Sequence, residues 1–314
     1  MKQFLILIIS VLNVCVNVEL HAQSPFDFIQ MGISARSAGL GGAFTSITND
    51  HTTVFFNPGA LSSVEKSTVS ATFMQHVLDI GSGQAIYTLP FEKNSSERFA
   101  VSAIYTSYGA FDRTDEFGTI TGTFSANNIA FMGSYSNELD STLSYGCNAK
   151  FLYASLDDLS STAIALDAGV LYRLPASRTN IGFSILNIGT QLSTFTGFTD
   201  RLPVDVRLGI NHRLRGLPLL LNFTFHHLAD DADAFFDRVG NFGIGGEFIL
   251  SKIVNLRLGY DNYVRNATSI QGQRRFSGFA AGIGVKTEYV IIDYAASALG
   301  TAGSIHRLTV TTTL

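Results

Sequence analysis

The stretch LSYGCNAKFLYAS, residues 143–155, decides the fold because its side chains alternate strictly between two kinds. One face carries Leu143, Tyr145, Cys147, Ala149, Phe151 and Tyr153. The opposite face carries Ser144, Gly146, Asn148 and Lys150. A period of two, with one apolar face and one small or polar face, predicts a β-strand.

The same alternation recurs along most of the chain after residue 65. We predict fourteen strands, which begin near Lys66, Gly83, Arg98, Gly122, Leu143, Ser161, Asn180, Pro203, Leu219, Gly240, Ile253, Phe276, Glu288 and Gly303. Most segments span about eight to twelve residues, close to the ~9–11 residues of a tilted membrane strand. The pattern therefore indicates an all-β protein.

The connections between these segments differ in length according to strand parity. Long connections follow strands 3, 7, 9 and 11, at residues 109–121, 188–202, 228–239 and 262–275. Connections after even-numbered strands are short, as in outer-membrane barrels with short periplasmic turns. A soluble sandwich or barrel also alternates, but its water-facing side would carry more charge and less glycine. We predict a 14-stranded antiparallel transmembrane β-barrel over residues 66–314.

Composition excludes several other classes of protein. Only 15% of the 314 residues are charged, against ~25% in a typical soluble domain. The mean hydropathy is +0.23, which argues against a disordered chain. After the N-terminus no apolar run approaches the ~20 residues of a membrane helix. The net charge of -4 gives no sign of nucleic-acid binding.

The N-terminus resembles a secretory signal peptide over residues 1–22. Lys2 precedes a mostly apolar stretch, and Ala22 is the small residue before a cleavage site that leaves Gln23 first. The alternative is a buried N-terminal strand. Export predicts an outer-membrane location for the barrel. Cys147 is then the one mature cysteine, so neither an intrachain disulfide nor a cysteine zinc site is expected.

Residues 23–65 lack strand periodicity and are predicted to form a periplasmic hatch, or plug. Its motif residues are Gly39, Gly41, Gly42, Asn57 and Pro58. Glycine lets one backbone approach another closely, as a plug against a barrel wall requires. A phosphate-binding loop is the alternative, but the spacing is wrong and no clear strand precedes it.

The inward faces carry charges of both signs in near balance. We predict a lumen network of Lys150, Asp167, Arg173, Asp205, Arg207, Glu247, Arg257, Lys286 and Asp293. Charges at membrane depth are expected to pair with one another. A selective ion pore would favour one sign, so a structural network is the better interpretation.

Short motifs in order resemble a known family. Residues 34–42 (SARSAGLGG), 49–50 (ND) and 56–61 (FNPGAL) look like the hatch opening of the PorV/PorQ family, FadL-like barrels of the type IX secretion system. Residues 256–260, 276–286 and 293–295 are most similar to the PorQ branch. The resemblance implies a non-enzymatic outer-membrane barrel, without a cofactor, that anchors a PorZ-like surface partner near PorU and PorV. Cargo would there be attached to lipopolysaccharide.

Two alternative functions stay open. A FadL-type channel for hydrophobic small molecules would need a connected apolar pocket, whereas the inward strand faces are mostly Gly, Ser, Asn and charges. A hydrolase would need a nucleophile and a base in contact. The nearest cluster is His226-His227 before an acidic run, but adjacent residues of a strand point to opposite faces. No catalytic residue and no metal site is predicted.

The connection 228–239 is a candidate partner loop. Its acidic and aromatic residues are Asp230, Asp231, Asp233, Phe235, Phe236 and Asp237. Charges can steer a protein partner and aromatic side chains can anchor it. The alternative is that the two phenylalanines fold back over the barrel mouth.

Overall fold

The computed structural model describes residues 24–78, 80–89, 95–230, 238–268 and 276–314. The predicted signal peptide lies outside the described residues, as do Asp231, Asp233, Phe235, Phe236 and Asp237 of the candidate partner loop. None of the helices in the described ranges is long and apolar enough to cross a membrane.

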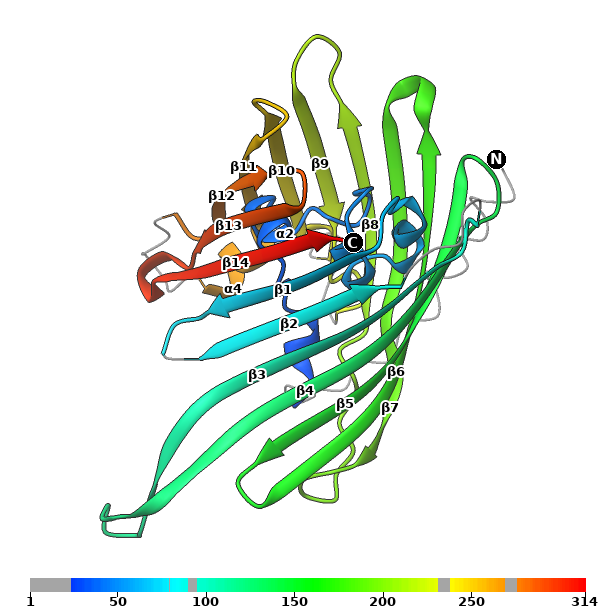
Figure 1. The fold of residues 1–314 in the computed structure, drawn as a ribbon. Helices are drawn as coiled ribbons and strands as arrows, with labels where there is room; N and C mark the ends of the chain where they lie inside the picture. The colour runs from blue at the N-terminus through cyan, green and yellow to red at the C-terminus, as the bar shows by residue number, and fades with distance from the viewer. Residues whose placement is uncertain (1–23, 79, 90–94, 231–237, 269–275) are drawn as a thin grey trace.

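Fourteen antiparallel strands close into a single barrel (Figure 1). The strands are β1 (Thr68–Gln75), β2 (Gly81–Thr88), β3 (Arg98–Thr114), β4 (Ile120–Glu138), β5 (Leu143–Leu156), β6 (Leu159–Leu174), β7 (Thr179–Ser193), β8 (Asp205–Arg213), β9 (Leu219–Phe225), β10 (Phe242–Ile249), β11 (Val254–Asp261), β12 (Phe279–Lys286), β13 (Val290–Ala298) and β14 (Ser304–Thr313). β1 pairs with β14, from Thr68↔Thr313 to Gln75↔His306, which closes the barrel and removes its free edges. The predicted fold is confirmed, and every strand begins within three residues of its predicted start.

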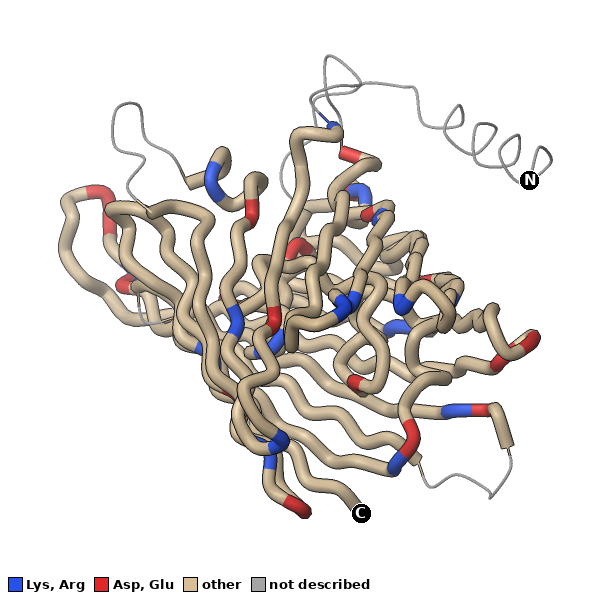
Figure 2. Tube along the Cα trace, turned by 90° about the horizontal axis from the view of Figure 1, so that it is seen from above, with Lys and Arg blue, Asp and Glu red and all other residues tan. Residues whose placement is uncertain are grey.

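The two faces of each strand differ as the alternation predicts. Along β5 the residues from Ser144 to Ala154 alternate strictly between buried and exposed. The outward positions carry large apolar side chains, including Phe131, Leu166 and Leu258, each more than half exposed. Lys, Arg, Asp and Glu are sparse along the strands (Figure 2), and the charged strand residues Lys150, Asp167, Arg207, Glu247, Arg257 and Asp293 are buried. An outer surface of this kind suits the hydrocarbon of a bilayer.

The wall is uneven in height, which differs from the prediction. Strands β3 to β7 contain 14 to 19 residues, whereas the others contain 7 to 10. The predicted long loop 109–121 is wrong, because β3 and β4 continue as a paired arm with a turn at 115–119. Gly109 has a φ of 83° at a bulge. A glycine at a bulge within a strand resembles, in the sequence, a glycine at the end of a strand. The arm projects beyond the barrel at the bottom of Figure 1.

The other connections keep most of the predicted parity. The longest follow odd-numbered strands, at 194–204, 226–241 and 262–278, and the last contains helix α4 (Asn262–Thr268). Connections after β4, β6, β8, β10 and β12 are short. We call the barrel end with connections after odd-numbered strands the odd end, and the opposite end the even end.

Residues 24–64 lie inside the barrel and form a plug. It contains the short helices η1 (Asp27–Gln30), α2 (Ala35–Gly39), η2 (His51–Phe55) and η3 (Pro58–Ser63). Helix α2 packs against β11 to β14, and η3 packs against β3 to β7. About half of the buried hydrophobic side chains belong to the plug, where Phe26, Ile33, Leu40, Phe44, Ile47 and Leu61 are fully buried. The apolar plug therefore fills a barrel whose inner wall is mainly small and polar.

Candidate functional site

Glycines of the barrel wall receive the plug. Three pairs lie directly opposite each other on neighbouring strands: Gly146 and Gly169, Gly182 and Gly209, and Gly245 and Gly259. A Cβ atom at Gly182 would lie 2.2 Å from the Thr45 carbonyl oxygen, and one at Gly259 would lie 2.1 Å from the Gly41 nitrogen. Backbone meets backbone at these positions, so no side chain fits between plug and wall.

The five predicted hatch residues lie at this contact. Gly41, with a φ of 61°, rests against the backbone of Tyr260, and Gly42 has a φ of 71°. Gly39 lies beside Arg257 and Gly282. Asn57 caps η3 by accepting a hydrogen bond from the Gly59 N–H at 3.0 Å, and its Nδ2 donates to the carbonyls of Thr45 and Val170 at 2.9 Å each. Pro58 begins η3.

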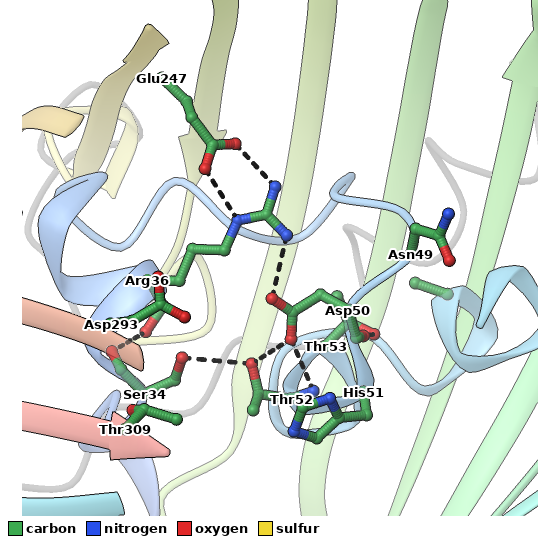
Figure 3. A network of polar contacts seen from close by, with 12 residues as sticks. Ser34, Arg36, Asn49, Asp50, His51, Thr52, Thr53, Glu247, Asp293 and Thr309 are labelled. Atoms are coloured by element: carbon green, nitrogen blue, oxygen red, sulfur yellow. Dashed lines mark hydrogen bonds and ion pairs between the residues drawn. The ribbon is translucent and has the colours of Figure 1, made fainter. Parts of the chain in front are cut away.

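Arg36 of helix α2 ties the plug to the wall (Figure 3). Its Nη2 lies 2.7 Å and its Nε 3.2 Å from the two carboxylate oxygens of Glu247 on β10. Its Nη1 donates to Asp50 Oδ2 at 3.0 Å. Glu247 also accepts a hydrogen bond from Arg257 Nε at 2.7 Å, and Arg257 in turn pairs with Asp293. We call these five side chains the plug lock.

Arg36 and Asp50, the two plug members of the plug lock, keep their charges over a wide pH range. Burial alone would lower the pKa of Arg36, but Glu247 and Asp50 raise it above its usual value. Burial would likewise raise the pKa of Asp50, but Arg36 and the hydrogen bond with Thr52 lower it to about 2. Burial lowers the pKa of His51, whose Nε2 contacts Ser70 Oγ at 2.7 Å.

We expect the barrel to stay closed as the pH falls from 8 to near 4. Because the pKa of Asp50 is about 2 in the folded protein and 3.8 ordinarily, its stabilisation is complete above 3.8 and is lost as the pH falls through about 2. Conductance across planar bilayers should therefore rise only at strongly acidic pH. Asp50→Asn should remove that acid dependence. Opening near pH ~6, where histidine titrates, would contradict this assignment.

The remaining residues of the predicted lumen network form two buried pairs and include two separate side chains, Arg173 and Lys286. Lys150 Nζ pairs with Asp167 Oδ2 at 2.8 Å, and both contact Asn187, which has a φ of 63° at a bulge in β7. Arg207 Nε pairs with Asp205 Oδ2 at 2.6 Å. These two pairs are buried.

Two members lie apart from the buried network. Arg173 pairs with Glu138 at 2.7 Å at the even end, where both side chains are partly exposed. Lys286 is the last residue of β12, where the wall ends, and its side chain is exposed rather than held inside the lumen. Arg36, which the sequence analysis did not place in the network, connects its largest part.

The plug separates two cavities. The odd-end cavity, of about 490 Å³, lies beside Ser37 and Ala38 of α2. The even-end cavity, of about 470 Å³, lies beside Arg36 of the same helix. A molecule crossing the barrel between them would have to displace the plug or part of it.

The odd-end cavity has a mixed lining, in which apolar and aromatic side chains that were not predicted from the sequence lie beside charged ones such as Arg207 and Asp261. Its apolar and aromatic residues include Phe28, Met31 and Phe56 of the plug and Ile80, Tyr263 and Leu299 of the connections. The wall strands supply few of them, so strand periodicity gave no signal. The stretch from Phe26 to Ile33 in the plug, which is rich in apolar residues but interrupted by Asp27 and Gln30, was the available indication.

His226 and His227 both line this cavity, so the prediction that their side chains point to opposite faces is wrong. β9 ends at Phe225, and His227 has a φ of 55°, which brings the two rings to 5.1 Å between centroids. The His227 ring stacks on Tyr263 at 4.1 Å, and its Nδ1 lies 3.2 Å from Oδ2 of Asp230, the one described acidic residue of the candidate partner loop. Among the described residues, no three His, Cys, Asp or Glu side chains are placed to hold a metal ion.

Solved structures with a similar fold are FadL-type outer-membrane barrels. The Ralstonia pickettii toluene transporter TbuX is 12% identical, with a TM-score of 0.58 over 90% of this chain and 98% of that one. The monoaromatic hydrocarbon channel CymD is 10% identical, with a TM-score of 0.61 over the same shares. A Pseudomonas aeruginosa FadL homologue is 12% identical, with a TM-score of 0.51 over 88% and 97%.

No family model and no curated protein matches the sequence. At identities this low the likeness concerns the fold alone. The chain has the fold of the FadL-type outer-membrane barrels, with fourteen strands around an N-terminal plug.

Proposed function

We propose that this protein is an outer-membrane channel that admits small hydrophobic molecules through the odd-end cavity. The observation that carries the proposal is the apolar and aromatic lining of that cavity. Its volume of about 490 Å³ lies within the ~300–1,000 Å³ of small-molecule sites. The fold is also that of channels whose names refer to toluene and monoaromatic hydrocarbons.

The membrane placement follows from the outer surface and the connections. The apolar outer face needs a bilayer, and the N-terminal stretch resembles an export signal. Long loops face outward in outer-membrane barrels, so the odd end and its cavity would face the exterior. A guest would enter there and reach the plug before it reaches the even end.

Arg307, one of two buried arginines that line the cavity, gives it a polar contact point. Arg307 on β14 donates through Nη1 to Ser297 Oγ at 3.0 Å, while its Nε has no hydrogen-bond partner in the described chain. Burial and then the charge of Arg307 lower the pKa of His76 to about 4, so near neutral pH the arginine is the charged member of the two. This arginine can orient the polar end of a mostly apolar guest.

Filling the cavity should stop uptake. Ala280 on β12 is buried and lines the odd-end cavity, whereas its neighbour Ala281 faces outward. In a Gram-negative host without such a channel, the wild-type protein should raise the initial uptake rate of labelled toluene severalfold. Ala280→Phe should return uptake to background, and Ala281→Phe should match the wild type because it adds the same bulk on the bilayer side.

A wild-type protein that inserts normally but leaves uptake at background would contradict the channel proposal. Equal effects of the two phenylalanine variants would show that the added bulk acts through folding rather than through the cavity. Immunoblots of outer-membrane fractions control for the amount of protein in each strain.

A second candidate is the anchor of the type IX secretion system that the PorV/PorQ resemblance implies. The β3–β4 arm favours it, because Phe117 and Ile120 are exposed at 84% and 61% at the tip of the arm. Exposed apolar side chains on a projecting hairpin suit a protein partner. Two results together would favour the anchor. A PorZ-like protein, PorU and PorV would co-purify with the wild type, and the wild type would not raise toluene uptake.

A further inference from the structure

The even-end cavity gathers cationic side chains from four strand ends and the plug. Arg178 belongs to the β6–β7 connection and Lys252 to the β10–β11 connection. Arg213 and Lys286 are the last residues of β8 and β12. Arg36 reaches the cavity from α2. Residues far apart in the sequence thus place five positive charges around one space of about 470 Å³.

The lining contains one carboxylate against these five cations. It belongs to Glu247, which already pairs with Arg36 and Arg257. No ion pair among the described residues engages Arg178, Arg213, Lys252 or Lys286. Asn49, Asn255 and Ser251 add uncharged polar groups to the same lining. The cavity is therefore positive although the whole chain has a net charge of -4.

We propose that the even-end cavity binds a small multivalent oxyanion, an oligophosphate or a polycarboxylate. A recess lined by one sign of charge concentrates the field and attracts ions of the opposite sign. Several separate cations can each meet a different oxygen of such an anion through charge-assisted hydrogen bonds.

The shape of the site favours a small anion over an acidic protein segment. The volume lies within the ~300–1,000 Å³ typical of small-molecule sites. Arg36, the deepest of the five cations, belongs to the plug and lies inside the barrel, with its side chain 19% exposed. The other four cations lie at strand ends and in connections. A bulky partner would meet these four first, whereas a small anion can also approach Arg36.

The test is calorimetric titration of the purified, detergent-solubilised protein with inorganic tripolyphosphate and with citrate. Arg178→Gln/Arg213→Gln removes two cations of the site. Arg113→Gln/Arg201→Gln is the matched control, because it removes two exposed arginines that do not line this cavity. We expect saturable binding to the wild type and the control, and at least about tenfold weaker binding to the site variant.

Binding should also weaken as sodium chloride rises, because exposed charges are screened within ~10 Å at 0.1 M salt. Equal weakening in the two double variants would show a general effect of net charge and would overturn the proposal. The proposal would also be overturned if neither tripolyphosphate nor citrate bound saturably to the wild type. Tighter binding of a poly-glutamate peptide than of tripolyphosphate would assign the cavity to a macromolecular partner instead.

Discussion

Arg36→Met should open the barrel to ions. The substitution keeps the aliphatic part of the side chain but removes the cation that joins the plug to Glu247 and orients Asp50. In planar bilayers the wild type should show low conductance, since the plug separates the two cavities. The variant should show frequent openings, and its plug should become accessible to protease.

The size of the effect follows from burial. Glu247 is 2% exposed, and a buried pair that loses one partner costs ~3–5 kcal/mol. The lower figure applies here, because Arg257 continues to hold Glu247 at 2.7 Å and Arg36 is partly exposed. A loss of about 3 kcal/mol changes the ratio of plugged to open barrels by on the order of a hundredfold.

Arg173→Met is the matched control for this experiment. Arg173 pairs with Glu138 at the same distance of 2.7 Å, but the two side chains are 21% and 31% exposed at the even end. Pairs in such surroundings contribute ~0–1 kcal/mol, so the control should stay closed. Arg36→Lys should be intermediate, because an ammonium cannot form the two-point contact with Glu247. An Arg36→Met protein as closed as the wild type would show that other contacts hold the plug.

The strands could be predicted from the sequence because each has one outward apolar face. That alternation persists even where a strand is only seven or eight residues long, as in β9 and β10. The β3–β4 arm lacks this apolar–polar alternation, because it extends beyond the bilayer and both of its faces meet solvent from residue 110 onward. Gly109 at the bulge also resembled a turn.

The site was harder to predict than the fold, since it is built between elements distant in sequence. The charges of β10, β11 and β13 could be placed inward by strand parity, but parity does not apply to the plug that contributes Arg36 and Asp50. For the same reason, strand parity could not predict that Phe28, Met31 and Phe56 of the plug line the odd-end cavity. His227 was misplaced because β9 ends at Phe225, two residues before the predicted end of the strand, and His227 has a positive φ.

Adding a methyl group to two wall glycines should displace the plug without preventing barrel closure. The double variant Gly182→Ala/Gly259→Ala introduces Cβ atoms on β7 and β11. One would lie 2.2 Å from the Thr45 carbonyl oxygen and the other 2.1 Å from the Gly41 nitrogen. The nearest atoms at both sites belong to the plug, so the strands themselves have no reason to distort.

The two contacts cannot be relieved by a change of rotamer, because backbone faces backbone. Overpacking of this kind costs ~1–3 kcal/mol at each site. The plug segment between Gly41 and Thr45 is confined at both of its ends, so a shift that frees one end does not free the other. We therefore expect conductance comparable with that of Arg36→Met, together with normal heat-dependent mobility of the closed barrel in detergent gels.

Gly133→Ala is the matched control, because this glycine faces outward on β4 and an added Cβ would meet nothing within 4 Å. Alanine costs less backbone entropy than glycine on folding, so this variant should be as stable as the wild type or slightly more stable, and it should stay closed. If the double variant also stays closed, the plug can move inward by an ångström or more, and the glycine wall is not what fixes its position. If the barrel itself fails to form, these glycines serve strand pairing, and the plug would have to be tested through Arg36 alone.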